Sequence, residues 1–331
     1  MTLDVELDRP GRHQGALLVP WSRDASAYGQ LVVPVIVLRG GPGPTLLITA
    51  AVHGDEYEGQ IVLPELARTL EPKSLRGRLI LVPRANPLAA RAGRRTSPED
   101  GGNLARLFPG APDAGITGAL AAAITASLLP LADAVLDLHA GGSSLEYLPC
   151  AWGRLPTDLA LAARTLDLLT AFGAPLTAVT ASPQASSTLV AQALALGCPA
   201  MATELGGGGA VTPTTLALAR DGCSRVMAHL GIVPDAPRPG PTRLLAVHAR
   251  HFLRSPGPGL FAPHVTLGAE VAPGDTAGLL HDPERPDLPP RALVFPGSGL
   301  LICRRVPAPC EPGDVLAHLA EETTAQALLR R

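Results

Sequence analysis

Aromatic side chains are scarce in this chain: Phe, Trp and Tyr make up 3% of its 331 residues, although 46% are hydrophobic. The core must therefore be built from Leu, Val, Ile and Ala, and a ring-lined surface for single-stranded nucleic acid is not expected. Charge of one sign is also lacking, because 27 basic residues balance 29 acidic ones to a net charge of −2. Nothing in this balance favours DNA, RNA or an anionic membrane, so we expect a small-molecule partner.

Paired cysteines, a leader segment and long apolar runs are missing as well. The N-terminus has neither the basic nor the apolar part of a secretion signal, and no run approaches about 18 uninterrupted apolar residues. We therefore expect a cytoplasmic protein, and the sequence leaves homo-oligomerisation open. The five cysteines are odd in number, form no C-x-x-C pair and are typical of reduced core thiols: Cys150, Cys198, Cys223, Cys303 and Cys310.

Short apolar runs alternate with amphipathic stretches up to residue 205, which predicts an α/β fold with a mixed central sheet covered by helices. We expect strands at 31–38, 45–52, 78–83, 132–139 and 198–205, and helices at 57–70, 116–129, 159–171 and 187–196. Polar residues follow the downstream ends of these strands. In open α/β sheets that edge is where ligands bind.

The composition changes at the proline-dense segment 233–243, beyond which short Val/Leu runs are broken by Pro-Gly turns. Two similar blocks follow, each with a Pro-Gly-Asp turn before an apolar run. This pattern predicts a catalytic α/β domain at 1–240 and a smaller, β-rich, barrel-sandwich-like domain at 241–331.

The strongest local motif is His53-Gly54-Asp55-Glu56, at the transition from a predicted strand to a predicted helix. A His and a Glu three residues apart can aim one imidazole nitrogen and one carboxylate at a common metal if the turn is tight, and Gly54 permits such a turn. The alternative is a solvated turn whose Glu interacts with the helix dipole.

A second motif, Asp137-Leu138-His139-Ala140-Gly141-Gly142, places a His at the end of an apolar strand. Strand alternation puts Asp137 on the same side as His139, where its carboxylate can orient a ligating imidazole. A lone His in this position is more often a surface residue. Its significance rests on the other ligands.

Two His and one Glu leave a fourth position of a zinc ion open for water, as a catalytic site requires. Glu204 supplies a carboxylate that partial burial can turn into a general base, followed by four glycines. On this segment alone, an exposed Glu before a flexible loop is an equal alternative. Arginines between residues 86 and 106 are suited to clamping a carboxylate or stabilising an oxyanion, although such loops are often merely solvated.

Taken in order, H-G-D-E, N-P, D-G-G-N-L-A-R-L-F-P-G, D-L-H-A-G-G and T-E-L-G resemble the succinylglutamate desuccinylase/aspartoacylase family, relatives of the zinc carboxypeptidases. The resemblance covers about residues 45–210, and the tail is compatible with it. It implies one Zn²⁺ per chain at His53, Glu56 and His139, with Glu204 as general base. It further implies a carbonyl-polarising arginine, Arg94 or Arg95, and substrate contacts at Arg106, Asn103 and Asn86.

The chain departs from the family at Ala105, where relatives commonly have an asparagine that assists the following arginine. The identity of the substrate is therefore open, whereas the chemistry is not. The D-L-H-A-G-G motif with Leu145, Tyr147 and Pro149 looks closer to the branch of N-acetyl-diaminobutyrate deacetylases. The tail resembles a biotinyl carrier domain, but the chain's single lysine, Lys73, lies outside it, which excludes covalent cofactor attachment.

The expected activity is zinc-dependent hydrolysis of the amide bond of a small N-acyl amino acid. One alternative is a metallocarboxypeptidase acting on peptides, which the low aromatic content disfavours because a large hydrophobic side-chain pocket is not expected. The other is a non-catalytic metal-binding scaffold, which the joint presence of three ligands and a base disfavours.

Overall fold

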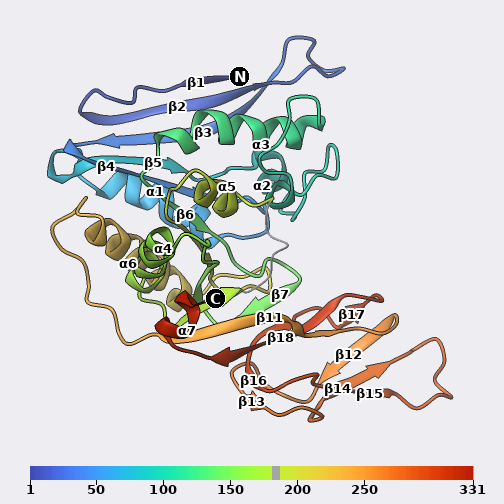
Figure 1. Cartoon of the computed structure of the whole chain (residues 1–331). Coiled ribbons are helices and arrows are strands. Elements are labelled where there is room, and N and C mark those ends of the chain that lie inside the picture. The colour runs from blue at the N-terminus through green and yellow to red at the C-terminus, as the bar shows by residue number, and fades with distance from the viewer. Residues whose placement is uncertain (181–186, 331) are drawn as a thin grey trace.

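The computed structural model describes residues 1–180 and 187–330 (Figure 1). Its main element is a sheet of 14 strands in the order β1-β2-β3-β5-β4-β6-β10-β8-β9-β11-β18-β16-β13, with β7 paired to β16. The strands up to β10 are β1 (Thr2–Asp4), β2 (Gly11–Pro20), β3 (Gln30–Arg39), β4 (Gly41–Ala50), β5 (Arg76–Val82), β6 (Ala134–Leu138), β7 (Leu145–Tyr147), β8 (Cys150–Gly153), β9 (Leu176–Thr180) and β10 (Ala200–Glu204).

The centre of the sheet is parallel, because β4 pairs in parallel with both β5 and β6, and β6 pairs in parallel with β10. Parallel strands need crossover connections, which place helices on both faces and bury both sides of each strand. Accordingly all five residues of β6 are buried. Their near-continuous apolar sequence follows from this position.

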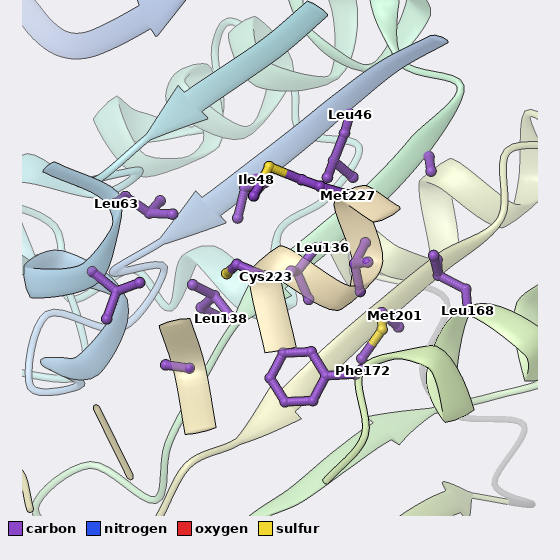
Figure 2. Close-up of a cluster of buried hydrophobic side chains, with 14 of the residues drawn as sticks. Leu46, Ile48, Leu63, Leu136, Leu138, Leu168, Phe172, Met201, Cys223 and Met227 are labelled. Atoms are coloured by element: carbon purple, nitrogen blue, oxygen red, sulfur yellow. The ribbon is translucent and has the colours of Figure 1, made fainter. Parts of the chain in front are cut away.

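Helices cover the sheet on its two faces. On one face α1, α4 and α6 pack against strands β4, β6 and β10, and Figure 2 shows this cluster with Leu63, Phe172, Cys223 and Met227 among its members. A second cluster lies under α3 and α5. The helices are α1 (Glu58–Thr69), α2 (Pro87–Ala92), α3 (Gly115–Ser127), α4 (Leu159–Ala171), α5 (Leu189–Ala195), α6 (Pro213–His229) and α7 (Ala325–Leu329), with 3₁₀ turns η1 (Pro72–Ser74), η2 (Leu104–Arg106) and η3 (Leu129–Leu131).

The C-terminal part extends the same sheet. Strand β11 pairs in parallel with β9, and β18 and β16 continue from it. A separate four-stranded sheet, β15-β14-β12-β17, lies at the far end of the molecule (Figure 1). The remaining strands are β11 (Arg243–Arg254), β12 (Gly259–Pro263), β13 (Glu270–Val271), β14 (Thr276–His281), β15 (Arg291–Val294), β16 (Gly299–Arg305), β17 (Pro309–Cys310) and β18 (Val315–Glu322).

The expected fold class is confirmed: a mixed α/β sheet is covered by helices and followed by a smaller β-rich part. Each expected strand and helix is present within a few residues, and the helix expected at 187–196 begins next to residues outside the described part. The domain boundary expected at residue 240 stays a prediction. Ladder hydrogen bonds between β9 and β11 join the segments before and after it. None of the described helices is long and apolar enough to cross a membrane.

Several elements were not expected from the sequence, and β2 and α6 are the longest of them before residue 240. Strand β2 forms a long antiparallel hairpin with β3. The first half of β2 is polar and only its alternate residues are partly buried, so it lacks the apolar run by which the other strands were recognised. Helix α6 follows the glycine run, and a capping box between Thr212 and Thr215 starts it just before Pro213. A cap and an N-terminal proline are recognisable start signals, so α6 was detectable from sequence.

Candidate metal centre and active site

Four of the expected site residues meet at one edge of the sheet. His53 follows β4, His139 follows β6, and Glu204 ends β10, and these three strands are neighbours in the sheet. Glu56 lies just before α1, which starts beside the end of β4. All four residues line one cavity of about 420 Å³. The parallel arrangement brings the carboxyl ends together, as the position of a ligand site in such sheets requires.

Two imidazoles converge on a single carboxylate. The Nδ1 atoms of His53 and His139 lie 2.7 and 2.8 Å from the two carboxylate oxygens of Glu56. One ligand atom from each residue lies within 4.8 Å of the others, and in the described part of the chain this is the one cluster of His, Cys, Asp and Glu with that property. His53 and Glu56 are 4% exposed, so these polar groups are buried away from bulk water.

The outward-facing nitrogens of both imidazoles have their own partners. His53 Nε2 lies 3.2 Å from Asn103 Oδ1, and His139 Nε2 lies 2.8 Å from Asp137 Oδ2. Thr49 in turn donates to the other oxygen of Asp137 at 2.6 Å. Such partners fix the tautomer and ring orientation of ligating histidines, so each ring is held with Nδ1 toward Glu56.

The turn after β4 depends on close packing. Ala51 has a left-handed φ of 55°, and its carbonyl accepts a hydrogen bond from Asn86 N. Gly54 keeps an ordinary φ, but a Cβ there would lie 2.0 Å from the backbone of Ala89. Gly54 is therefore needed because α2 lies against it, and not because the turn needs a left-handed residue.

Asp55, the remaining member of the motif, connects the two ligand segments. Its Oδ2 accepts hydrogen bonds from Ser143 N at 2.8 Å and Ser143 Oγ at 2.7 Å. A Cβ on Gly142 would collide with this carboxylate. The glycines after His139 therefore let the chain approach Asp55, which ties the two segments that carry the candidate metal ligands together.

Glu204 faces the cluster from β10, where it pairs with Cys150 of β8. Its Oε2 is buried without a hydrogen-bond partner among the described residues. Burial and the nearby Glu56 carboxylate raise the pKa of Glu204 well above its ordinary value, while His139 and Arg95 oppose the shift. A carboxylate with a raised pKa is suited to taking up and releasing a proton near neutral pH.

The charges within the cluster depend on one another. Burial by itself raises the pKa of Glu56, but the His53 and His139 imidazoles hold it below its usual range. Burial lowers the pKa of His53. Burial also lowers that of His139, but Asp137 and Glu56 outweigh it and raise the pKa. A metal must displace the proton that His139 then carries, which makes binding pH-dependent.

Of the two candidate arginines, one lines the cavity and the other does not. Arg95 Nη1 lies 3.4 Å from His53 Nδ1 and 3.7 Å from Glu56 Oε1. Arg94 is exposed, does not line the cavity, and contributes its backbone carbonyl to Gly54 N. Arg95 is therefore the arginine in position to polarise a carbonyl beside the cluster.

The other expected substrate contacts divide in the same way. Arg106 lines the cavity next to the buried Ala105, whose carbonyl accepts from Arg106 Nη1 at 3.0 Å. Asn86 lies elsewhere: it is fully buried, and its Oδ1 accepts from Ala89 N at the start of α2 and from Ser97 Oγ. Asn103 contacts His53 and is not among the cavity-lining residues. Asn86 thus lies where it can serve packing, and Asn103 lies where it can orient the His53 imidazole.

Several lining residues were not assigned to the site from sequence. Tyr147 and Trp152 come from β7 and β8, and Phe252, Arg254 and His318 come from the C-terminal strands β11 and β18. No local motif marks the last three. They reach the cavity because the C-terminal part continues the central sheet, a long-range pairing that a sequence pattern does not reveal.

A His-Glu-His cluster that could hold a metal ion, a buried carboxylate and an arginine lie around one cavity at the edge of an open α/β sheet, an arrangement suited to a hydrolase. The chain belongs to the succinylglutamate desuccinylase/aspartoacylase family, whose catalytic-domain model matches residues 42–230. It is similar to the N-alpha-acetyl-L-2,4-diaminobutyric acid deacetylase of Halomonas elongata, with 39% identity over 97% of this chain and 94% of that protein.

Solved structures agree with this family. The product-bound ectoine utilization protein EutE (DoeB) of Ruegeria pomeroyi is similar with a TM-score of 0.93 and 38% identity, covering 96% of this chain and 97% of that one. A succinylglutamate desuccinylase from Silicibacter sp. TM1040 is similar with a TM-score of 0.92 and 36% identity, covering 98% and 100%. The likeness extends over the C-terminal part as well as the matched catalytic region.

Proposed function

We propose that this protein is a zinc-dependent deacetylase of a small N-acetyl amino acid, with Nα-acetyl-2,4-diaminobutyrate as the first substrate to test. The observation that carries the proposal is the convergence of His53, Glu56 and His139 on one point, with Glu204 and Arg95 facing the same cavity. The relatives support the substrate class, since a protein that is similar to this chain over almost its whole length is named for deacetylation of this compound.

The donor set fits zinc. Two imidazole nitrogens and one carboxylate, the groups gathered here, are the ligands of many catalytic zinc sites, which keep a fourth position for water. Asn103 and Asp137 complete the site from behind by holding both imidazoles. When bound, zinc would supply a Lewis acid for the scissile carbonyl and would lower the pKa of water toward neutrality.

The chain's own groups handle the protons and the charge. Glu204 takes the proton of the attacking water, and later gives it to the amine nitrogen as the carbon–nitrogen bond breaks. Arg95 stabilises the negative charge that develops on the carbonyl oxygen. Arg106, which lines the cavity close to Arg95 and Glu204, is a guanidinium available for the substrate's carboxylate, which it can hold through two hydrogen bonds.

The size of the cavity supports a small substrate over a peptide. About 420 Å³ is at the lower end of the volumes typical of small-molecule sites, and it must hold the acyl group as well as the amino acid. A metallocarboxypeptidase needs further room for the residues that precede the scissile bond. Hydrolysis of peptides in preference to N-acetyl amino acids would support that alternative instead.

The direct test is hydrolysis of N-acetyl, N-succinyl and N-formyl amino acids by zinc-loaded protein, measured by release of free amine. We expect turnover of N-acetyl compounds, about one zinc per chain by elemental analysis, and loss of zinc in His53→Ala and His139→Ala. The absence of turnover for every compound in the panel would refute the proposed deacetylase activity. Unchanged zinc content in both variants would refute the metal site.

A further inference from the structure

Rings are concentrated at the cavity to an extent that the composition does not predict. The chain has five Phe, two Trp and three Tyr, and three of these ten, Tyr147, Trp152 and Phe252, line the one cavity together with His318. Tyr147 contacts Trp152 edge to face at 5.8 Å and His318 edge to face at 5.6 Å, and Phe252 stacks on His318 at 3.8 Å. We call these four side chains the ring wall.

His318 is held rigidly within the ring wall. It is the direct cross-strand partner of Phe252 between β11 and β18, and the two rings are parallel to within 5°. Its Nδ1 lies 3.2 Å from Tyr147 Oη. Its Nε2 has no partner among the described residues, although the ring lines the cavity. One ring nitrogen is thus left for a ligand.

The surroundings allow that nitrogen to act as a hydrogen-bond acceptor. Burial, with Arg254 nearby, lowers the pKa of His318 to about 3, so the imidazole is neutral at physiological pH. A hydroxyl can accept as well as donate, so Tyr147 Oη can take a hydrogen bond from His318 Nδ1–H. In that tautomer His318 Nε2 carries a lone pair toward the cavity.

The charged lining residues show where an ammonium group has to be recognised. The acidic ones, Glu56, Asp137 and Glu204, all belong to the metal cluster or its base. The ring wall includes no carboxylate. An amine that lies against the ring wall would therefore be bound by ring faces, as aromatic sites hold cations, and by the neutral His318 nitrogen.

We propose that the ring wall is the subsite for the substrate's side chain, and that His318 Nε2 and the aromatic faces select a short side chain ending in an amine. This inference rests on the proposed deacetylase function. Arg254 already places a cation over Phe252, 5.8 Å from the ring centroid, while its Nη1 donates to the carbonyl of Gly313. Its charge opposes a second cation, so its removal should strengthen the selection.

The test compares Nα-acetyl-2,4-diaminobutyrate with N-acetyl-2-aminobutyrate, which has the same carbon chain without the amine. The wild-type ratio of kcat/KM should favour the diamine. His318→Phe keeps a ring on Phe252 but removes the acceptor, and the ratio should fall about tenfold or more, as expected for a hydrogen bond to a charged group. His318→Gln keeps an acceptor and should restore part of the ratio, and Arg254→Gln should raise it.

The matched control is His264→Phe, because His264 is exposed and does not line the cavity. Its ratio should equal that of the wild type. An unchanged ratio in His318→Phe, or a wild-type preference for N-acetylglutamate over both test compounds, would overturn the proposal.

Direct binding separates this inference from the proposed function. Calorimetry with free 2,4-diaminobutyrate and 2-aminobutyrate measures the ring wall without turnover. We expect the diamine to bind more tightly to wild type and to lose that advantage in His318→Phe. Equal binding of both amino acids to the wild type refutes the proposed selectivity of the ring wall, even if hydrolysis occurs. Selective binding without hydrolysis supports it and refutes the deacetylase.

Discussion

Glu204 illustrates how one side chain obtains its role from its surroundings. The carboxylate ends β10 with one oxygen buried and without a partner in the described part of the chain, and burial and Glu56 raise its pKa. Glu204→Gln keeps the size and removes the proton acceptor. We expect turnover to fall about 10²- to 10⁴-fold, the range for positioned acid–base groups, with zinc content unchanged. Steady-state kinetics and elemental analysis measure both. Activity within about tenfold of wild type would place the base elsewhere.

Asn103 is informative because its expected role and its position differ. We expected a substrate contact, and its amide oxygen instead lies 3.2 Å from His53 Nε2. Asn103→Ala should therefore weaken zinc binding about 10- to 100-fold, as is typical when the partner of a ligating histidine is lost. Competition with a chelator measures this. A variant with normal zinc affinity and a raised KM would restore the substrate-contact assignment.

Glu58 is an acid whose burial gives a pH dependence of stability. It is 2% exposed at the start of α1, one oxygen lacks a partner among the described residues, and burial raises its pKa from 4.5 to about 7. The folded state then binds more protons than the unfolded state between these values. Stability is therefore lost as pH rises through this window, by up to about 3 kcal/mol.

Glu58→Gln removes this titration, so the variant's unfolding free energy should change less between pH 5 and pH 8 than that of the wild type. Urea denaturation at both pH values measures the difference. The matched control is Glu65→Gln in the same helix, where the half-buried carboxylate pairs with Arg220 of α6. A Glu58→Gln profile that parallels the wild type would contradict the raised pKa.

Among the elements, α6 shows how a local signal stabilises a packed helix. Thr212 accepts from Thr215 N at 3.0 Å, and Thr212 N donates to Thr215 Oγ1 at 3.1 Å. The helix then packs Cys223, Val226 and Met227 into the core cluster of Figure 2. Thr212→Ala should lower the unfolding free energy by about 1 kcal/mol.

The control for this prediction is Thr214→Ala, an exposed position of the same helix without a capping role in the structure. Alanine has the better helix propensity, so that variant should be neutral or slightly stabilising. Denaturant titration distinguishes the two. Equal losses in both would show that the cap contributes nothing, and kcat should be unaffected because α6 does not line the cavity.

For the whole molecule, the continuous sheet determines whether the C-terminal part of the chain can be removed without unfolding the rest. Leu176 and Ala178 of β9 pack with Leu245 and Val247 of β11 in one buried cluster. A chain ending at residue 240 would expose this cluster and leave β9 as an unpaired edge. We expect the truncated protein to aggregate or to lose cooperative unfolding, measured by size-exclusion chromatography and thermal circular dichroism. A soluble monomer with cooperative unfolding would support the boundary as a limit between independent domains.

The sequence by itself determined the class of the fold and the local motifs. Apolar runs buried on both faces are readable because burial imposes composition on every residue of a central strand, as in β6. The ligand candidates were readable because a metal demands specific donor types at strand ends. Arg94 and Arg95 could not be separated in this way, since both follow a short helix and one turn decides which side chain faces the cavity.

Only the tertiary structure decided the cavity's other residues. Phe252 and His318 reach the site through the pairing of β11 with β9 and of β18 with β11, and such long-range pairing has no signature in a local pattern. The hydrogen-bond partners of Asn86 and Asn103 were decided in the same way, because a hydrogen bond between separate segments depends on the fold that brings them together. Chemical type is a property of the residue, whereas its partner is a property of the packed chain.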